Sequence, residues 1–223
     1  MATWMVHLRI ADVVLKHRKE LEPAMFSVGN IAPDCGTGVK DSLGEFEPPP
    51  KITHWTPSGK KSEIRPADFF EAYLKKKPRD LSALSFYLGY YSHLLTDVLW
   101  SQNIFSPAYA MYGLEKEKEG FILEAKRDWN YLDHAFYLSH PGLRTYVLLD
   151  NIRSVPDYLP YYKPGQLTKQ SRFIADYYKS LKLPLQERQT KYLTDKKAAV
   201  FIRQAGAEIL QRLNNILLEE DVK

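Results

Sequence analysis

Two polar residues, His93 and Asp97, stand four residues apart in the stretch LSALSFYLGYYSHLLTDVLW. This stretch is apolar around nearly its whole circumference, which predicts a central helix surrounded by other helices. Residues four apart share one helical face, so the two side chains can hold one object together. An ionised carboxylate buried there is costly without a partner, so Asp97 needs a cation, a hydrogen-bond donor or a metal ion. For this pair alone, a simple His–Asp hydrogen bond is the plainer interpretation.

Three further polar residues favour a metal site. His7 is in phase with the apolar residues of a predicted first helix, while Asp34 in GNIAPDCG and His54 in THWTPSGKK lie on turns stiffened by proline and glycine. Each alone has a plainer explanation, as a core histidine or a turn residue. Together with His93 and Asp97 they offer the nitrogen and oxygen donors that zinc prefers, and a carboxylate can bridge two ions.

Phosphoester hydrolysis is one reaction that zinc ions in such a site support. Two zinc ions about 3.5 to 4 Å apart can activate water and clamp a phosphoryl group. The hypothesis has three imidazole ligands and a bridging carboxylate: His7, His54, His93 and Asp97. Asp34 is both a ligand and the catalytic residue that orients or deprotonates the water. The pocket wall is expected to include aromatic residues of the central helix and its end: Tyr90, Tyr91 and Trp100.

Helical periodicity dominates the rest of the chain, and no alternating strand pattern is evident. Glycine and proline are frequent over residues 22–66, which predicts a long loop region that a ligand or metal ties down. Helices are predicted over residues 5–19, 66–77, 81–100, 115–138, 143–152, 167–181 and 195–220. The sequence therefore predicts an all-α fold, a single-domain multi-helix bundle over residues 1–223 around a central buried helix.

Composition and charge narrow the class of protein. The 31 Lys and Arg residues against 27 Asp and Glu give a formal charge of +4, which falls short of a concentrated basic stripe, so no stable nucleic-acid complex is expected. The single cysteine, Cys35, excludes an internal disulfide. The first residues lack the pattern of a secretory signal, and no stretch is long and apolar enough for a membrane span. A cytoplasmic location is expected.

Four short motifs resemble the zinc-dependent phospholipase C family, which is related to the P1-type nucleases. VHLRIAD places His7, GNIAPD places Asp34, THWTPSGK places His54, and YLGYYSHLLTDVLW places His93 and Asp97. The motifs occur in the family's order, and the resemblance runs over residues 4–134. It implies a helical fold, zinc as cofactor, and a phosphoester as substrate.

Three departures from the family pattern limit the zinc count. Trp4 follows Met1, Ala2 and Thr3, whereas secreted members begin with a tryptophan whose amino group binds zinc. A further family histidine corresponds to Asn103, a poor ligand. On the next helix the remaining candidates are Asp128, Asp133 and His134, for which helix-surface charge is the alternative. One to two zinc ions are expected, and a third is not.

The resemblance leaves several functions open. A phospholipase C-like phosphodiesterase, acting on a phospholipid head group or a smaller phosphodiester, is the first hypothesis, with peripheral membrane contact as a possible partner interaction. The alternatives are a P1-like nuclease, a degenerate metal-binding scaffold without catalysis, and a metal-free helical protein with a buried His–Asp pair. Only the last requires no metal.

Overall fold

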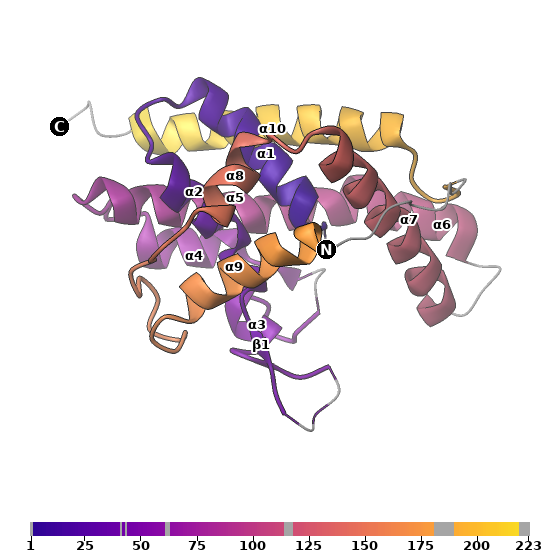
Figure 1. Cartoon of the computed structure of the whole chain (residues 1–223), viewed down its shortest axis with the longest axis horizontal. Helices are drawn as coiled ribbons and strands as arrows, with labels where there is room; N and C mark the ends of the chain where they lie inside the picture. Colours follow the sequence, from indigo (N-terminus) through magenta and orange to yellow (C-terminus); the bar gives the residue numbers. More distant parts are fainter. Residues whose placement is uncertain are drawn as a thin grey trace.

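Helices carry the architecture of this protein, whose computed structural model describes residues 2–40, 42, 44–60, 63–113, 118–180 and 190–218 (Figure 1). Two short strands, β1 (Thr37–Gly38) and β2 (Phe46–Glu47), pair antiparallel. The prediction of an all-α fold is confirmed. Among the helices in these ranges, none has the length and apolar character needed to cross a membrane.

The predicted central helix is confirmed as α5 (Leu81–Trp100). Its first turn is capped by Asp80, whose carboxylate accepts a hydrogen bond from the backbone N–H of Ala83 at 2.8 Å. Most of the helix beyond Ser85 is buried, including His93 and Asp97. A helix that is apolar on every side must be enclosed by others, and α5 runs along the long axis of the molecule beside α10 (Asp195–Leu218) (Figure 1).

A second helix, α2 (Pro23–Ile31), packs against α5 where the sequence predicted the start of a long loop. That prediction was wrong because Gly29 was interpreted as a helix breaker. In the structure Gly29 and Gly89 are the points at which the two helices touch. A Cβ on Gly29 would overlap the carbonyl oxygen of Phe86, and one on Gly89 would overlap that of Phe26. Both positions require glycine for the close approach of two backbones.

The other predicted helices enclose the pair α2 and α5: α1 (Trp4–His17), α4 (Pro66–Tyr73), α7 (Lys118–Ser139), α8 (Arg144–Asp150), α9 (Gln166–Lys179) and α10. Helix α4 ends before the predicted residue 77, since Pro78 disfavours helical backbone in the residue before it. The predicted boundaries at residues 115, 181 and 220 lie outside the described residues. Three short segments were not predicted: α3 (Pro50–Thr53), the π-helix η3 (Ser101–Phe105) and α6 (Ser106–Tyr112).

Replacing Gly29 with alanine is expected to lower the free energy of unfolding by about 1–3 kcal/mol, because the new methyl group cannot fit between α2 and α5. Gly120→Ala is the matched control. Gly120 is also helical, but a Cβ there meets no atom within 4 Å, so this variant should be as stable as the wild type or slightly more so. Urea unfolding followed by circular dichroism measures both. Equal midpoints for Gly29→Ala and the control would contradict the close crossing.

Candidate metal centre

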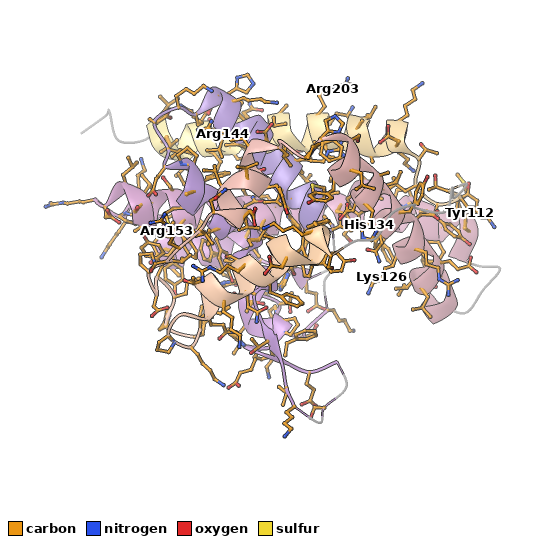
Figure 2. The ribbon with its side chains drawn as sticks, viewed as in Figure 1. Tyr112, Lys126, His134, Arg144, Arg153 and Arg203 are labelled. Carbon is orange, nitrogen blue, oxygen red and sulfur yellow. The ribbon has the colours of Figure 1, made fainter. Side chains whose placement is uncertain are left out.

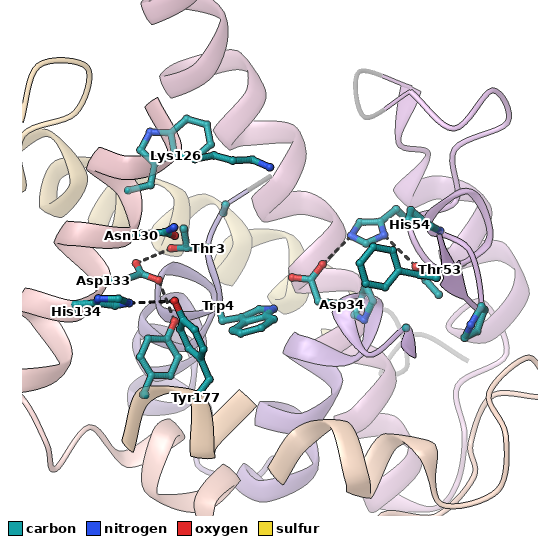
Figure 3. A pocket seen from close by; sticks show the side chains of 18 residues that line it. Thr3, Trp4, Asp34, Thr53, His54, Lys126, Asn130, Asp133, His134 and Tyr177 are labelled. Atoms are coloured by element: carbon teal, nitrogen blue, oxygen red, sulfur yellow. Dashed lines mark hydrogen bonds and ion pairs between the residues drawn. The ribbon is translucent and has the colours of Figure 1, made fainter. Parts of the chain in front are cut away.

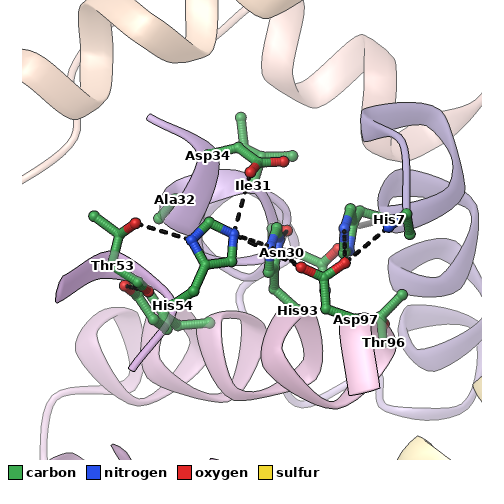
Figure 4. Close-up of polar contacts among 12 residues, drawn as sticks. His7, Asn30, Ile31, Ala32, Asp34, Thr53, His54, His93, Thr96 and Asp97 are labelled. Carbon is green, nitrogen blue, oxygen red and sulfur yellow. Dashed lines mark hydrogen bonds and ion pairs between the residues drawn. The ribbon is translucent and has the colours of Figure 1, made fainter. Parts of the chain in front are cut away.

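Five polar side chains from four separate segments meet in the core (Figure 4). His7 comes from α1, and Asp34 ends η1 (Ala32–Asp34), a 3-10 turn that continues α2. His54 directly follows α3. His93 and Asp97 lie one turn apart on α5, as their spacing predicted. Residues up to 90 positions apart in the sequence therefore form one cluster.

Asp97 lies at the middle of this cluster. Its Oδ1 is 3.5 Å from Nε2 of His7, and its Oδ2 is 3.7 Å from Nε2 of both His54 and His93. The backbone N–H of Ala2 donates a hydrogen bond to Oδ1 at 2.8 Å. One oxygen of the carboxylate is thus held by the backbone, while the other faces two imidazoles.

The ring of His93 is oriented by α2. Its Nδ1 lies 2.8 Å from the carbonyl oxygen of Asn30, and a carbonyl can only accept, so the ring proton belongs on Nδ1. The lone pair of Nε2 then points toward the cluster, 3.4 Å from Nε2 of His54. On the other side of His54, Nδ1 lies 3.0 Å from the Thr53 hydroxyl. An imidazole fixed in this way through its outer nitrogen is the usual arrangement of a metal-binding histidine.

Several buried atoms of the cluster have no hydrogen-bond partner among the described residues: both ring nitrogens of His7 and Oδ2 of Asp97. The His7 ring stacks on His93 with centroids 3.7 Å apart, so this face of the ring is covered as well. Buried polar atoms are rarely left unsatisfied, because each costs about 1–3 kcal/mol. A cation in the cluster would satisfy Oδ2 of Asp97 and one ring nitrogen of His7. The donor set fits zinc, with two groups whose ligand atoms lie within 4.8 Å of one another: His7, Asp34 and His93, and His54, His93 and Asp97.

The protonation states also suit a cation. Burial lowers the pKa of His93 to about 3, so its imidazole is neutral at pH 7. Burial alone would raise the pKa of Asp34 and Asp97, but the imidazole of His54 beside the first and that of His7 beside the second lower both below the ordinary value. Nε2 of His54 is 3.3 Å from Oδ1 of Asp34. Neutral imidazoles and ionised carboxylates are the forms in which these side chains bind metals.

Residues 6–100, which carry all five side chains, match the model of a protein family described as zinc dependent phospholipase C. Over these residues the chain is similar to the zinc-dependent phospholipase C family. Searches of curated proteins and of solved structures gave no significant match. The family assignment therefore rests on the first part of the chain, through the end of α5.

A cavity of about 410 Å³ gives access to this cluster (Figure 3). Asp34 and His54 line one side of it, together with Thr53 and the proline-rich segment after β2. His7, His93 and Asp97 do not line it and are closed off in the core. The cluster is therefore open to a ligand on the side of Asp34 and His54.

The expected aromatic wall of the pocket is wrong. Tyr90 and Trp100 are fully buried and are not among the lining residues, nor is Tyr91. Tyr90 instead donates a hydrogen bond to the carbonyl of Thr53, which holds the segment that carries His54. The aromatic walls come from other elements: Trp4, Phe46, Trp129, Tyr177 and Tyr178. Helical periodicity could not separate these from ordinary core residues.

The three further candidates on α7 make other contacts. Asp128 is fully buried and accepts hydrogen bonds from the backbone N–H groups of Lys191 and Tyr192, at 2.8 and 2.7 Å. It anchors the segment that leads into α10. None of Asp128, Asp133 and His134 belongs to the two groups of clustered ligand atoms found among the described residues.

Asp133 and His134 lie on the far side of the cavity. Asp133 accepts hydrogen bonds from the Thr3 hydroxyl at 2.6 Å, from the Tyr178 hydroxyl at 2.9 Å and from the backbone N–H of Met5. Burial raises its pKa to about 6. The three hydrogen bonds of Asp133 fix the segment before α1. This segment in turn places the backbone N–H of Ala2 on the carboxylate of Asp97.

Two backbone groups of the site were not foreseen, the N–H of Ala2 and the carbonyl of Asn30. Asn30 was visible in the motif GNIAPD, but its position next to His93 follows only once α2 is recognised as a helix that crosses α5. The Ala2 contact joins residues 95 positions apart, and no local signal in the sequence indicates it.

Asp128→Ala is expected to lower the free energy of unfolding by about 1–3 kcal/mol, since it leaves two backbone N–H groups without their acceptor. Asp128→Asn retains one side-chain oxygen and should lose less. Neither variant should change the zinc content of the purified protein, because Asp128 is not in the cluster. The partly exposed Asp68 supplies the control Asp68→Ala. Loss of zinc with unchanged stability would instead make Asp128 a ligand.

Proposed function

We propose that this chain is a zinc-dependent phosphodiesterase of phospholipase C type, which acts on a phospholipid head group or a smaller phosphodiester. The observation that carries the proposal is the arrangement of the cluster, in which unsatisfied buried atoms lie next to carboxylate and imidazole groups that face a cavity. A self-contained His–Asp hydrogen bond would satisfy its own atoms. The match of residues 6–100 to the zinc-dependent phospholipase C family supports the same conclusion.

In this proposal zinc is held by His7, Asp34, His54, His93 and Asp97, with Asp97 between the imidazoles. Bound zinc supplies Lewis acidity, which activates water near neutral pH and offsets charge on a phosphoryl oxygen. The protein contributes orientation: the carbonyl of Asn30 fixes the ring of His93, and the N–H of Ala2 fixes the carboxylate of Asp97. Ligands held by such outer contacts need little rearrangement during a reaction.

Asp34 has a second role in this proposal, because it is the ionised carboxylate of the cluster that lines the cavity. We assign it to orient a water molecule for attack on phosphorus and to accept its proton. The aromatic walls of the cavity exclude other water and position the apolar part of the substrate. General-base assistance of this kind contributes roughly 100- to 10,000-fold to a rate.

A scaffold without catalysis is the second candidate, and the burial of the cluster favours it. His7 and His93 have no exposed surface, and structural zinc sites are typically enclosed by protein donors on all sides. The cavity at Asp34 and His54 argues for the enzyme instead. A P1-like nuclease receives less support, since the described cavity lining contains one basic side chain, Lys126, rather than a positively charged groove.

Zinc content tests the site directly. Protein purified without a histidine tag should contain one to two zinc ions per chain by elemental mass spectrometry. Asp97→Asn and His93→Ala should each lower that content, because both remove a donor of the cluster. His17→Ala and Asp68→Asn are matched controls at exposed positions and should retain it. No stoichiometric metal in the wild type after zinc repletion would reject the zinc site.

Hydrolysis tests the function. A chromogenic phosphodiester, a phosphocholine ester and single-stranded DNA should be assayed in parallel, and one of the first two should be the best substrate. Asp34→Asn is expected to lower kcat by about 100-fold or more, while Asp68→Asn is expected to change nothing. A wild-type protein that binds zinc but leaves all three substrates intact would support the scaffold.

A further inference from the structure

The wall of the cavity opposite Asp34 and His54 is one face of α7. Lys126, Trp129, Asn130 and Asp133 are spaced i, i+3, i+4 and i+7, so they project from the same side of the helix. Figure 3 shows Trp4 between this face and Asp34. The cavity therefore has two polar ends, with an aromatic side chain between them.

Two side chains at the α7 end are free to bind a ligand. Lys126 is exposed on α7 (Figure 2) and is the one cationic side chain of the described lining, and it forms no ion pair with a described residue. The amide of Asn130, one turn further along, is exposed and has no hydrogen-bond partner in the described part of the chain. An ammonium group and an amide together offer several donors to an anion or to hydroxyl groups.

The carboxylate at this end is not free to bind a cation. Both oxygens of Asp133 are occupied by donors from Thr3, Met5 and Tyr178. A cationic head group would meet aromatic faces here, but it would also meet the like charge of Lys126. The groups left for a ligand thus favour negative charge.

We propose that Lys126 and Asn130 form a subsite for a second anionic group of the substrate, such as a phosphate or a carboxylate on the head group. This inference rests on the proposed phosphodiesterase function and adds to it a preference for substrates that carry a second anionic group. The scissile phosphodiester lies at Asp34 and His54, the carbon skeleton of the head group passes Trp4, and the second anion reaches α7. Lys126 is a specificity-determining residue rather than a catalytic one.

Binding without turnover gives the first test. Calorimetry should compare inositol 1-phosphate with inositol 1,4-bisphosphate on the zinc-loaded protein, so that the difference reports the second phosphate alone. In the wild type the second phosphate should tighten binding by roughly tenfold, and Lys126→Glu should remove that gain. Lys126→Arg should keep it. Because Lys126 is exposed, this gain in affinity should become smaller as the salt concentration rises.

Arg127→Glu is the matched control, since Arg127 is an exposed cation on the same helix that does not line the cavity. It should leave the gain from the second phosphate within about twofold of the wild type, because surface charges at a distance are screened. Equal affinity of the wild type for the two inositol phosphates, or no binding of either, would overturn the subsite. So would an equal loss in Arg127→Glu, which would indicate a general field effect.

Hydrolysis gives the second test and identifies the source of the anion. Dihexanoyl phospholipids with choline, glycerol and inositol 4-phosphate head groups should be compared with the deacylated diesters of the same head groups. Lys126→Glu should raise KM for the inositol 4-phosphate substrates by roughly tenfold relative to the glycerol substrates and improve the choline substrates. Preference for acylated over deacylated forms would identify a lipid. Unchanged KM ratios in Lys126→Glu would reject the subsite.

The two proposals can fail separately. If the wild type hydrolyses none of these diesters, the phosphodiesterase proposal fails, and calorimetry still decides whether α7 binds the second phosphate. If the wild type hydrolyses them with a preference for choline that Lys126→Glu does not alter, the enzyme stands and the anionic subsite is wrong.

Discussion

The negative charge of Asp97 is the constraint on which the arrangement of the core depends. This carboxylate lies on the buried central helix. The free-energy cost of burying an uncompensated charge there would exceed the net stability of a small domain. An N–H from residue 2 donates to one oxygen of the carboxylate, and imidazoles from three other positions lie within 3.7 Å of it, where a bound cation would complete the compensation. Three parts of the chain therefore meet at Asp97: helix α1, the segment after α3, and the first described residues.

That convergence depends in turn on the glycine contact between α2 and α5. Only a close crossing brings the carbonyl of Asn30 within hydrogen-bond distance of His93. The 3-10 turn that follows α2 then carries Asp34 to the edge of the cluster. A larger side chain at Gly29 or Gly89 would separate the helices and move two elements of the site at once. Packing and chemistry are therefore coupled at this crossing.

Much of this could be predicted from the sequence, because the strongest signals are local. The spacing of His93 and Asp97 and the apolar character around them gave the central helix with its observed bounds. The four motifs gave the five residues that cluster. The glycine in α2 was ambiguous, since the same residue type ends a helix or allows two helices to touch, and only the partner helix decides which. Helical periodicity could not predict the residues of the cavity wall. It identifies which face of a helix is buried, but not whether that face lines a cavity.

The position of the cavity favours the proposed catalytic role over a purely structural one. A zinc site that served stability alone would gain nothing from a cavity beside its ligands, and filling that cavity with apolar side chains would add burial. Here the cavity meets the cluster at Asp34 and His54, while α7 contributes an exposed lysine and an exposed amide at the other end. The buried half of the cluster, His7, His93 and Asp97, fixes the geometry by packing and outer hydrogen bonds. Asp34 and His54 line the cavity and can meet a ligand there, an arrangement that supports the proposed catalytic role.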